Sequence, residues 1–201
     1  MTRRRNPYAG GDARTRQAKG AGYPARSVFK LQEIDQRVKL LKRGQQVLDL
    51  GAAPGSWSLY AAERVGDTGH VLAIDLQVIQ QVFGPNVTVA QGDALSLTND
   101  ELARFAPYDV VLSDMAPSTS GSKVRDQAQS FELFMRALDV AAALGKPGSS
   151  FVGKLFMSGD FPAAKRAVAE RYRQSKVIRP AGTRQQSTEV FLVGQGLAKN
   201  L

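Results

Sequence analysis

Carboxylates follow several apolar segments of this chain where short strands are expected to end. Asp49 lies next to the end of the segment VLDL, Asp75 closes VLAID, and Asp93 follows VTVAQG. Because the carboxyl ends of neighbouring parallel strands meet at one edge of a sheet, we expect these side chains to lie close together. A carboxylate there can accept hydrogen bonds from ribose hydroxyls or from an amine, and it favours a cationic ligand. One such aspartate is more often a cap or turn residue, but three on one edge favour a ligand site.

A glycine-rich turn, GAAPG at 51–55, follows the first of these segments and precedes a helical pattern at 56–65. A P-loop needs a lysine and a series of backbone N–H donors, but no lysine follows here and Pro54 has no N–H. The dinucleotide fingerprint needs a glycine where this turn has Ala53. A ligand with a ribose but no phosphate fits better. S-adenosylmethionine is such a ligand, and its sulfonium cation suits the carboxylates.

Each carboxylate can be assigned a part of this cofactor. We expect Asp75 to accept both ribose hydroxyls, Asp93 to meet the adenine amine, and Asp49 to face the methionine ammonium. The predicted cofactor-binding residues lie in the turn, in the helix after it and at the strand ends: Asp49, Gly51, Ala53, Pro54, Gly55, Trp57, Asp75, Asp93 and Asp114.

Lys154 is the sole charged residue between Lys146 and Asp160, and it lies in the otherwise apolar segment SSFVGKLF. A buried lysine is costly unless it is paired. Asp114, at the end of DVVLSD, is the natural partner because its strand should end beside that of Lys154. The pair can be a structural ion pair, or it can be part of a reactive centre beside the cofactor.

The alternation of apolar segments with helical periodicity indicates the elements that position these residues. Ser27 is expected to cap the first helix, with Lys30 in its first turn. The expected strands are 46–50, 71–75, 87–90, 109–114, 150–155, 175–179 and 188–194, and the expected helices are 27–41, 56–65, 98–104, 126–144 and 161–172. This order predicts an α/β fold with helices on both faces of a mostly parallel, seven-stranded sheet. The short TRQQS connection before the last strand predicts that this strand is antiparallel.

The net charge of +9 is unevenly distributed along the 201 residues. Residues 1–43 carry twelve lysines and arginines against three acids, so the rest of the chain is neutral overall, with a second basic cluster at 165–184. This distribution indicates that the protein binds a polyanion such as RNA, and it fits less well a basic surface that only faces solvent. Residues 1–25 lack apolar periodicity and are expected to form a flexible arm.

The absence of cysteine and the single histidine argue against a metal site. The lack of a long apolar segment suggests a cytoplasmic protein.

Five segments, spread in order from about residue 26 to 193, carry a resemblance to a known family: RSVFKLQEID, VLDLGAAPGSWS, SDMAPSTSG, FVGKLF and QSTEVFLV. The chain resembles the FtsJ-type, or RlmE, ribosomal RNA 2′-O-methyltransferases. This resemblance implies a single Rossmann-like methyltransferase domain at 26–201 that uses S-adenosylmethionine. It also implies a catalytic set of two lysines and two acids, which falls on Lys30, Asp114, Lys154 and Glu189.

The implied reaction transfers a methyl group to a ribose 2′-hydroxyl, which must be positioned and must lose its proton. Lys154 would act either as a neutral general base or as a cation that stabilises the developing alkoxide, and the sequence leaves both open. Asp114 would orient Lys154, while Lys30 and Glu189 would align the ribose and the proton path.

The resemblance favours large-subunit ribosomal RNA as the substrate, at a uridine of the peptidyl-transferase A loop, in the large subunit or its precursor. It also suggests a monomer. Two alternatives remain at this level: a transfer RNA 2′-O-methyltransferase, and a non-catalytic RNA-binding assembly factor with the same fold.

Overall fold

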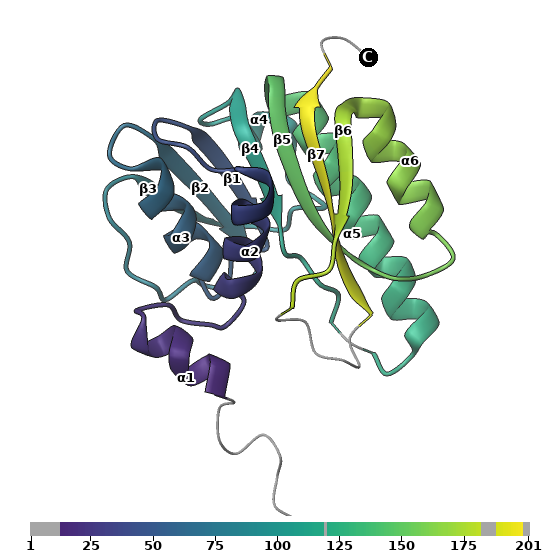
Figure 1. Ribbon diagram of the computed structural model, residues 1–201, viewed down its shortest axis with the longest axis horizontal. Helices are drawn as coiled ribbons and strands as arrows, with labels where there is room; N and C mark the ends of the chain where they lie inside the picture. Colours follow the sequence, from purple (N-terminus) through teal and green to yellow (C-terminus); the bar gives the residue numbers. More distant parts are fainter. Residues whose placement is uncertain (1–12, 119, 182–187, 199–201) are drawn as a thin grey trace, which may run out of the picture.

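A computed structural model describes residues 13–118, 120–181 and 188–198. Its sheet runs through the middle of the molecule with helices on both faces (Figure 1). The strands are β1 (Gln46–Leu50), β2 (His70–Asp75), β3 (Val87–Gln91), β4 (Tyr108–Ser113), β5 (Gly145–Phe156), β6 (Tyr172–Ile178) and β7 (Glu189–Leu197). The helices are α1 (Ala13–Gly20), α2 (Val28–Val38), α3 (Ser56–Val65), α4 (Asn99–Leu102), α5 (Lys123–Leu144) and α6 (Phe161–Arg171).

The strand order is β3-β2-β1-β4-β5-β7-β6, and β7 is antiparallel to both of its neighbours. The predicted seven-stranded, mostly parallel sheet is therefore confirmed. β7 runs upward in Figure 1, so the carboxyl ends of the parallel strands lie at the lower edge. The chain leaves β1 toward β2 on one side and later returns to β4 on the other. The carboxyl ends of β1 and β4 thus form a topological switch point, the usual ligand position in an open α/β sheet.

Two hydrophobic cores cover the two faces of the sheet. Leu31 and Ile34 of α2 pack with Trp57 and Ala61 of α3 on one face, and Phe134 of α5 belongs to the core of the other. β1 lies between these layers, and four of its five residues are buried. Its side chains on both faces are therefore enclosed, as is typical of a central parallel strand.

Several element boundaries differ from the predicted ones. α2 ends at Val38 instead of residue 41 because Lys39 adopts a left-handed conformation, with φ of 53°. Ser27 occupies the N-cap position but its side chain makes no capping bond; instead its carbonyl accepts from the Trp57 indole at 2.9 Å. β5 begins at Gly145 and β6 begins directly after α6, so both strands are longer than predicted.

The prediction of a flexible arm at 1–25 is wrong for the second half of this segment. Residues 13–25 form α1 and a loop that packs against α3, with Ala18 and Tyr23 buried. The Tyr23 hydroxyl donates to Glu63 at 2.5 Å. The sequence did not reveal this packing because one alanine and one tyrosine make no periodic apolar pattern. Residues 1–12 of the predicted arm lie outside the described residues.

No helix in the described ranges is long and apolar enough to span a membrane.

Candidate active site

The predicted catalytic residues gather on the face of the sheet that α2 and α3 cover. Ser113 is in register with Gly153 of β5, and Lys154 with Phe191 of β7, so Asp114, Lys154 and Phe191 follow one another across three strands. Side chains alternate between the two faces of a strand. Glu189 therefore points to the same face as Phe191.

Two ion pairs join these residues. Lys154 Nζ lies 2.9 Å from Asp114 Oδ1 and also donates to the backbone carbonyl of Asp114. Lys30, from the first turn of α2, places its Nζ 2.6 Å from Glu189 Oε1. The same Nζ lies 5.9 Å from the centroid of the Phe191 ring. Phe191 is thus between the two pairs, since it contacts Lys30 and pairs with Lys154 in the sheet.

Lys154 is only 7% exposed, so its ammonium depends on the oxygens around it. A lysine ammonium has three N–H donors, and one of them is used in the hydrogen bond to the Asp114 carbonyl. The Asp114 carboxylate lies at ion-pair distance, but its Oδ1 has no hydrogen-bond partner in the described part of the chain. Asp114 can therefore orient Lys154 without using all of the hydrogen-bonding capacity of the ammonium.

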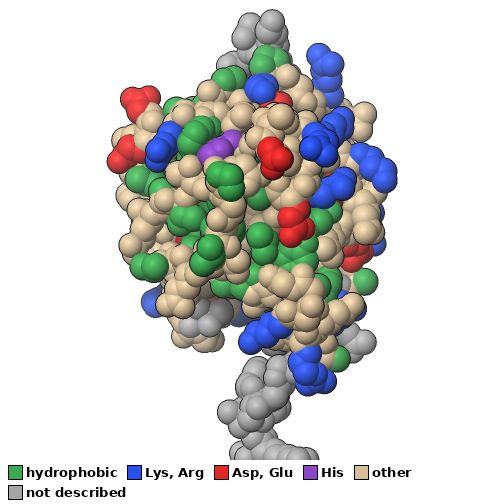
Figure 2. Space-filling model, turned by 90° about the vertical axis from the view of Figure 1, so that its left-hand side faces the viewer, with side chains coloured by type: hydrophobic (Ala, Val, Ile, Leu, Met, Phe, Trp, Pro, Cys, Tyr) green, Lys and Arg blue, Asp and Glu red, His purple; other side chains and the backbone are tan. Residues whose placement is uncertain are grey.

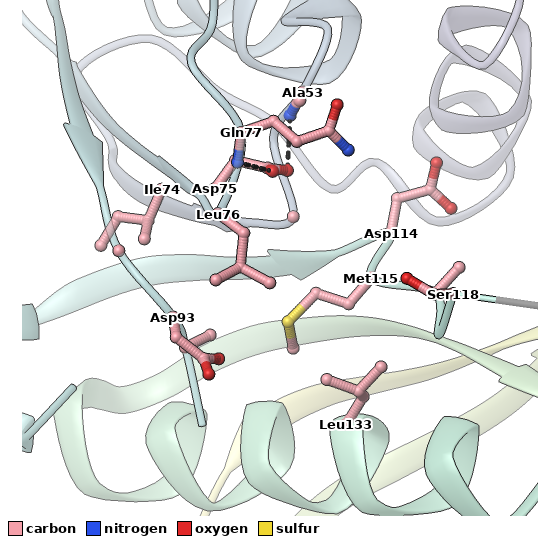
Figure 3. Close-up of a pocket in the computed structure, with 14 residues that line it drawn as sticks. Ala53, Ile74, Asp75, Leu76, Gln77, Asp93, Asp114, Met115, Ser118 and Leu133 are labelled. Atoms are coloured by element: carbon pink, nitrogen blue, oxygen red, sulfur yellow. Dashed lines mark hydrogen bonds between the residues drawn. The ribbon is translucent and has the colours of Figure 1, made fainter. Parts of the chain in front are cut away.

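A cavity of about 250 Å³ lies at the switch point, at the carboxyl ends of β1, β2 and β4. Asp75 and Asp93 lie on one side of it and Asp114 on the other, while Met115 and Leu133 form an apolar surface between them (Figure 3). The cavity thus combines carboxylates with an apolar wall. It lies next to the Lys154–Asp114 pair because Asp114 belongs to both.

Asp75 organises the loop that borders this cavity. Its Oδ2 accepts from the backbone N–H of Ala53 at 2.9 Å, and its Oδ1 accepts from that of Gln77 at 2.8 Å. A carboxylate has about four lone-pair positions, so each oxygen can still accept from a ligand. Asp93 has a local role as well, since its Oδ1 accepts from Leu95 N at 2.9 Å.

Gly51 allows the turn after β1 to lie against the end of β4. Its φ is +77°, and a Cβ at this position would lie 2.6 Å from Met115 Cγ and 2.9 Å from Met115 Cα. A larger residue would therefore displace the wall of the cavity.

Four predicted cofactor contacts do not line this cavity: Asp49, Pro54, Gly55 and Trp57. Trp57 is almost completely buried, and its ring packs 5.6 Å from that of Phe191. Its indole also holds the start of α2 through the bond to Ser27, and so supports the helix that carries Lys30. Pro54 borders a neighbouring surface groove that also includes Ala53 and Gln77.

Asp49 lies beneath the site instead of in it. Its side chain is fully buried, and Oδ2 accepts from the Ser58 hydroxyl at 2.6 Å. Oδ1 has no hydrogen-bond partner in the described part of the chain. Burial raises the pKa of the Asp49 carboxyl to about 7; the nearby Asp114 and Asp75 carboxylates act in the same direction, and the Ser58 hydrogen bond opposes them.

The structure also shows lining residues that the sequence did not reveal. Leu76, Gln77 and Met115 follow closely after strand-end aspartates, so their position in the chain was a usable signal. Leu133 comes from the middle of α5 and had no such signal.

The doubly wound sheet with an antiparallel β7, and the carboxylate-lined cavity beside a lysine–aspartate pair, are features of a Rossmann-like methyltransferase. The chain matches the FtsJ-like methyltransferase family over residues 23–197, and it belongs to that family. This result confirms the resemblance that the sequence motifs carried and the assignment as a methyltransferase.

Similar proteins cover most of the chain. The ribosomal RNA large subunit methyltransferase E of Sorangium cellulosum is 65% identical over 190 residues, which span 94% of this chain and 90% of that protein. The protein of the same name from Nitratidesulfovibrio vulgaris (strain Miyazaki F) is 50% identical over 182 residues, which span 89% and 90%. A crystal structure from Plasmodium falciparum, described as a ribosomal RNA methyltransferase, has a TM-score of 0.77 at 23% identity, covering 89% of this chain and 100% of that one. At that identity it supports the fold alone.

Proposed function

We propose that this chain transfers a methyl group from S-adenosylmethionine to a ribose 2′-hydroxyl of large-subunit ribosomal RNA, at a uridine of the peptidyl-transferase A loop. Membership of the FtsJ-like family supports the type of reaction. The name shared by the relatives, ribosomal RNA large subunit methyltransferase E, supports the RNA. The observation that carries the proposal is the position of the Lys154–Asp114 pair at the edge of the carboxylate-lined cavity.

The residues of the cavity fit S-adenosylmethionine. Asp75 would hold the ribose hydroxyls through its remaining lone pairs, and Asp93 would meet the adenine amine. Met115 and Leu133 offer an apolar surface for the adenine ring. Three carboxylates around the cavity favour a ligand that carries a sulfonium. When bound, the cofactor supplies an electrophilic methyl group.

An Asp75→Ala variant tests this assignment. It removes the proposed ribose acceptor, at an expected cost of about 1–3 kcal/mol in cofactor binding. Isothermal calorimetry measures the affinity, with Asp67→Ala, an exposed acid outside the cavity lining, as the control. Because Asp75 also holds the backbone of Ala53 and Gln77, thermal unfolding must confirm that the variant is folded. Unchanged affinity in a folded Asp75→Ala protein would exclude this role.

The residues of this chain would activate the ribose hydroxyl by holding it and its proton. As the oxygen forms its bond to the methyl carbon, the carbon–sulfur bond breaks and the hydroxyl proton leaves. A neutral Lys154 would accept that proton directly. A protonated Lys154 would instead stabilise the negative charge on the oxygen while the proton passes to water or to Glu189. Lys30, paired with Glu189, would contact the ribose or its phosphate and so position the nucleotide.

The decisive experiment maps methylated nucleotides. Purified protein and labelled S-adenosylmethionine are incubated with naked ribosomal RNA, with large ribosomal subunits and with transfer RNA. Each 2′-O-methyl position is then located by its resistance to alkaline cleavage. We expect one 2′-O-methyluridine in the large-subunit RNA. Preferential methylation of transfer RNA would favour the first alternative, and RNA binding without any methyl transfer would favour the assembly factor.

A further inference from the structure

A second polar cavity lies at the opposite edge of the sheet from the active site. Its volume is about 240 Å³, and it is bordered by the segment after α2, by residues 146–150 of β5 and by the end of β7. Asp109, at the start of β4, also lines it. These are the amino ends of the parallel strands, at the upper edge of the sheet in Figure 1. The methyl-transfer chemistry uses nothing here.

Positive charge exceeds negative charge around this cavity. Lys39, Lys42 and Lys146 line it, with Asp109 as the one acid among its lining residues. The Asp109 carboxylate is neutralised, because its Oδ2 lies 2.8 Å from Lys146 Nζ and also accepts from Gln46 N at 2.8 Å. Lys39 and Lys42 are exposed, and neither has an ion pair within the described ranges. Figure 2 shows several lysine and arginine side chains at the upper right of its view.

The turn at Gly148 leaves room at the edge of this cavity. Gly148 lines it and has a φ of +85°, with open space where a Cβ would lie. A ligand oxygen could therefore approach the backbone at this turn.

We propose that this cavity binds a phosphate group. Lys39 and Lys42 supply charge, and the open turn at Gly148 admits an oxygen. The phosphate can belong to the RNA backbone or be a free anion. An RNA phosphate as the ligand rests on the proposed function, and it means that a second strand of the folded RNA reaches the far edge of the sheet. A free anion as the ligand does not depend on that function.

The first measurement uses inorganic phosphate. In a nitrogen-15 NMR titration at constant ionic strength, the amide signals of residues 148–150 are expected to shift and to saturate. The Lys39→Gln/Lys42→Gln double variant should lose this response. A double variant of two exposed α6 residues, Lys165→Gln/Arg166→Gln, removes the same charge and should respond like the unmodified protein.

The second measurement uses RNA and identifies the source. If RNA phosphates occupy the cavity, the slope of log affinity against log salt becomes shallower in Lys39→Gln/Lys42→Gln than in the unmodified protein, by about 0.7–0.9 for each phosphate that is no longer neutralised. Equal slopes together with saturable phosphate binding would assign the cavity to a free anion. Equal slopes without saturable phosphate binding would overturn the proposal. Neither measurement depends on methyl transfer, so a failure of the proposed function would be recognised separately.

Discussion

Asp114 holds Lys154 through two different oxygens. The lysine Nζ lies 2.9 Å from the side-chain carboxylate and also donates to the backbone carbonyl of the same residue. Because β4 and β5 pair in parallel up to Ser113 and Gly153, the sheet itself determines where this ammonium points. A change at Lys154 should therefore affect the chemistry more than the binding of the cofactor.

We expect Lys154→Ala to lower the rate of methyl transfer by about 10²–10⁴-fold, the usual contribution of a positioned proton-transfer group. Cofactor affinity should change little because Lys154 does not line the cavity. Single-turnover methylation and calorimetry measure the two effects, and thermal unfolding confirms that the variant is folded. A rate within tenfold of the unmodified protein would remove Lys154 from the centre of the reaction.

A Lys154→Arg variant distinguishes the two roles of the lysine. Arginine keeps the positive charge but does not lose its proton in the working pH range. Substantial activity would therefore support charge stabilisation. A loss as severe as in Lys154→Ala, with the fold retained in thermal unfolding, would support the general base.

Gly51→Ala should disrupt the cofactor cavity. At positive φ an added Cβ costs roughly 1–2 kcal/mol in backbone strain, and at Gly51 it would also collide with Met115. Gly22→Ala is a matched control, since its φ of +86° causes the same strain while nothing lies within 4 Å of the added atom. We expect a lower melting temperature in both variants and a loss of cofactor affinity in Gly51→Ala alone. Normal affinity in Gly51→Ala would show that Met115 can move aside without harm to the site.

The buried Asp49 predicts a pH dependence of stability. Its pKa is raised from the ordinary value of 3.8 to about 7 in the folded protein, chiefly by burial. The folded state therefore binds a proton that the unfolded state releases, and the contribution of Asp49 to stability is complete below about pH 4 and is lost as the pH rises through about 7. Each pKa unit is worth roughly 1.4 kcal/mol.

Asp49→Asn should remove this dependence, because an amide can still accept from Ser58 without carrying a charge. In urea unfolding, the variant is expected to be more stable than the unmodified protein at pH 8, with a difference that shrinks toward pH 4. Asp67→Asn, at an exposed position, controls for the change in net charge. A constant difference across this pH range would mean that Asp49 does not titrate as described.

Two truncations separate the charge of the N-terminal segment from its packing. Deleting residues 1–12 removes Arg3, Arg4 and Arg5 but no residue that the structure describes. We expect unchanged stability, normal binding of S-adenosylmethionine, and weaker RNA binding. The salt slope should become shallower by about 0.7–0.9 for each phosphate that these arginines neutralise in the full-length protein. An unchanged slope would show that they do not contact RNA.

Deleting residues 1–25 should also destabilise the fold. It removes the buried Tyr23, whose burial is worth about 1.5–3 kcal/mol, and its bond to Glu63. It also removes the bond from Ala25 N to Ser56 Oγ. The melting temperature is expected to fall for this truncation alone. Equal stability of the two truncated proteins would mean that α1 contributes nothing to the fold.

The local pattern of the chain determined the elements and the chemistry at their ends. Apolar segments alternating with helical periodicity predicted the parallel sheet, and strand-end positions predicted that Asp75, Asp93 and Asp114 border one cavity. The motifs around Lys30, Lys154 and Glu189 resembled one family, and the chain belongs to it. These features depend on residues that are close together in the sequence, so the sequence alone could reveal them.

The tertiary structure decided which face each side chain takes and what packs against it. In β1, Leu48 and Asp49 are both buried although they point to opposite faces of the sheet. The sequence of β1 therefore showed no alternation of buried and exposed positions, and it could not tell that Asp49 lies under α3. The contribution of Leu133 and the position of Phe191 between the two ion pairs depend on contacts between distant segments. The packing of α1 against α3 is of the same kind. Such contacts form only when the whole sheet is assembled, because the free energy that selects them comes from burial across many elements and not from the preference of any one segment.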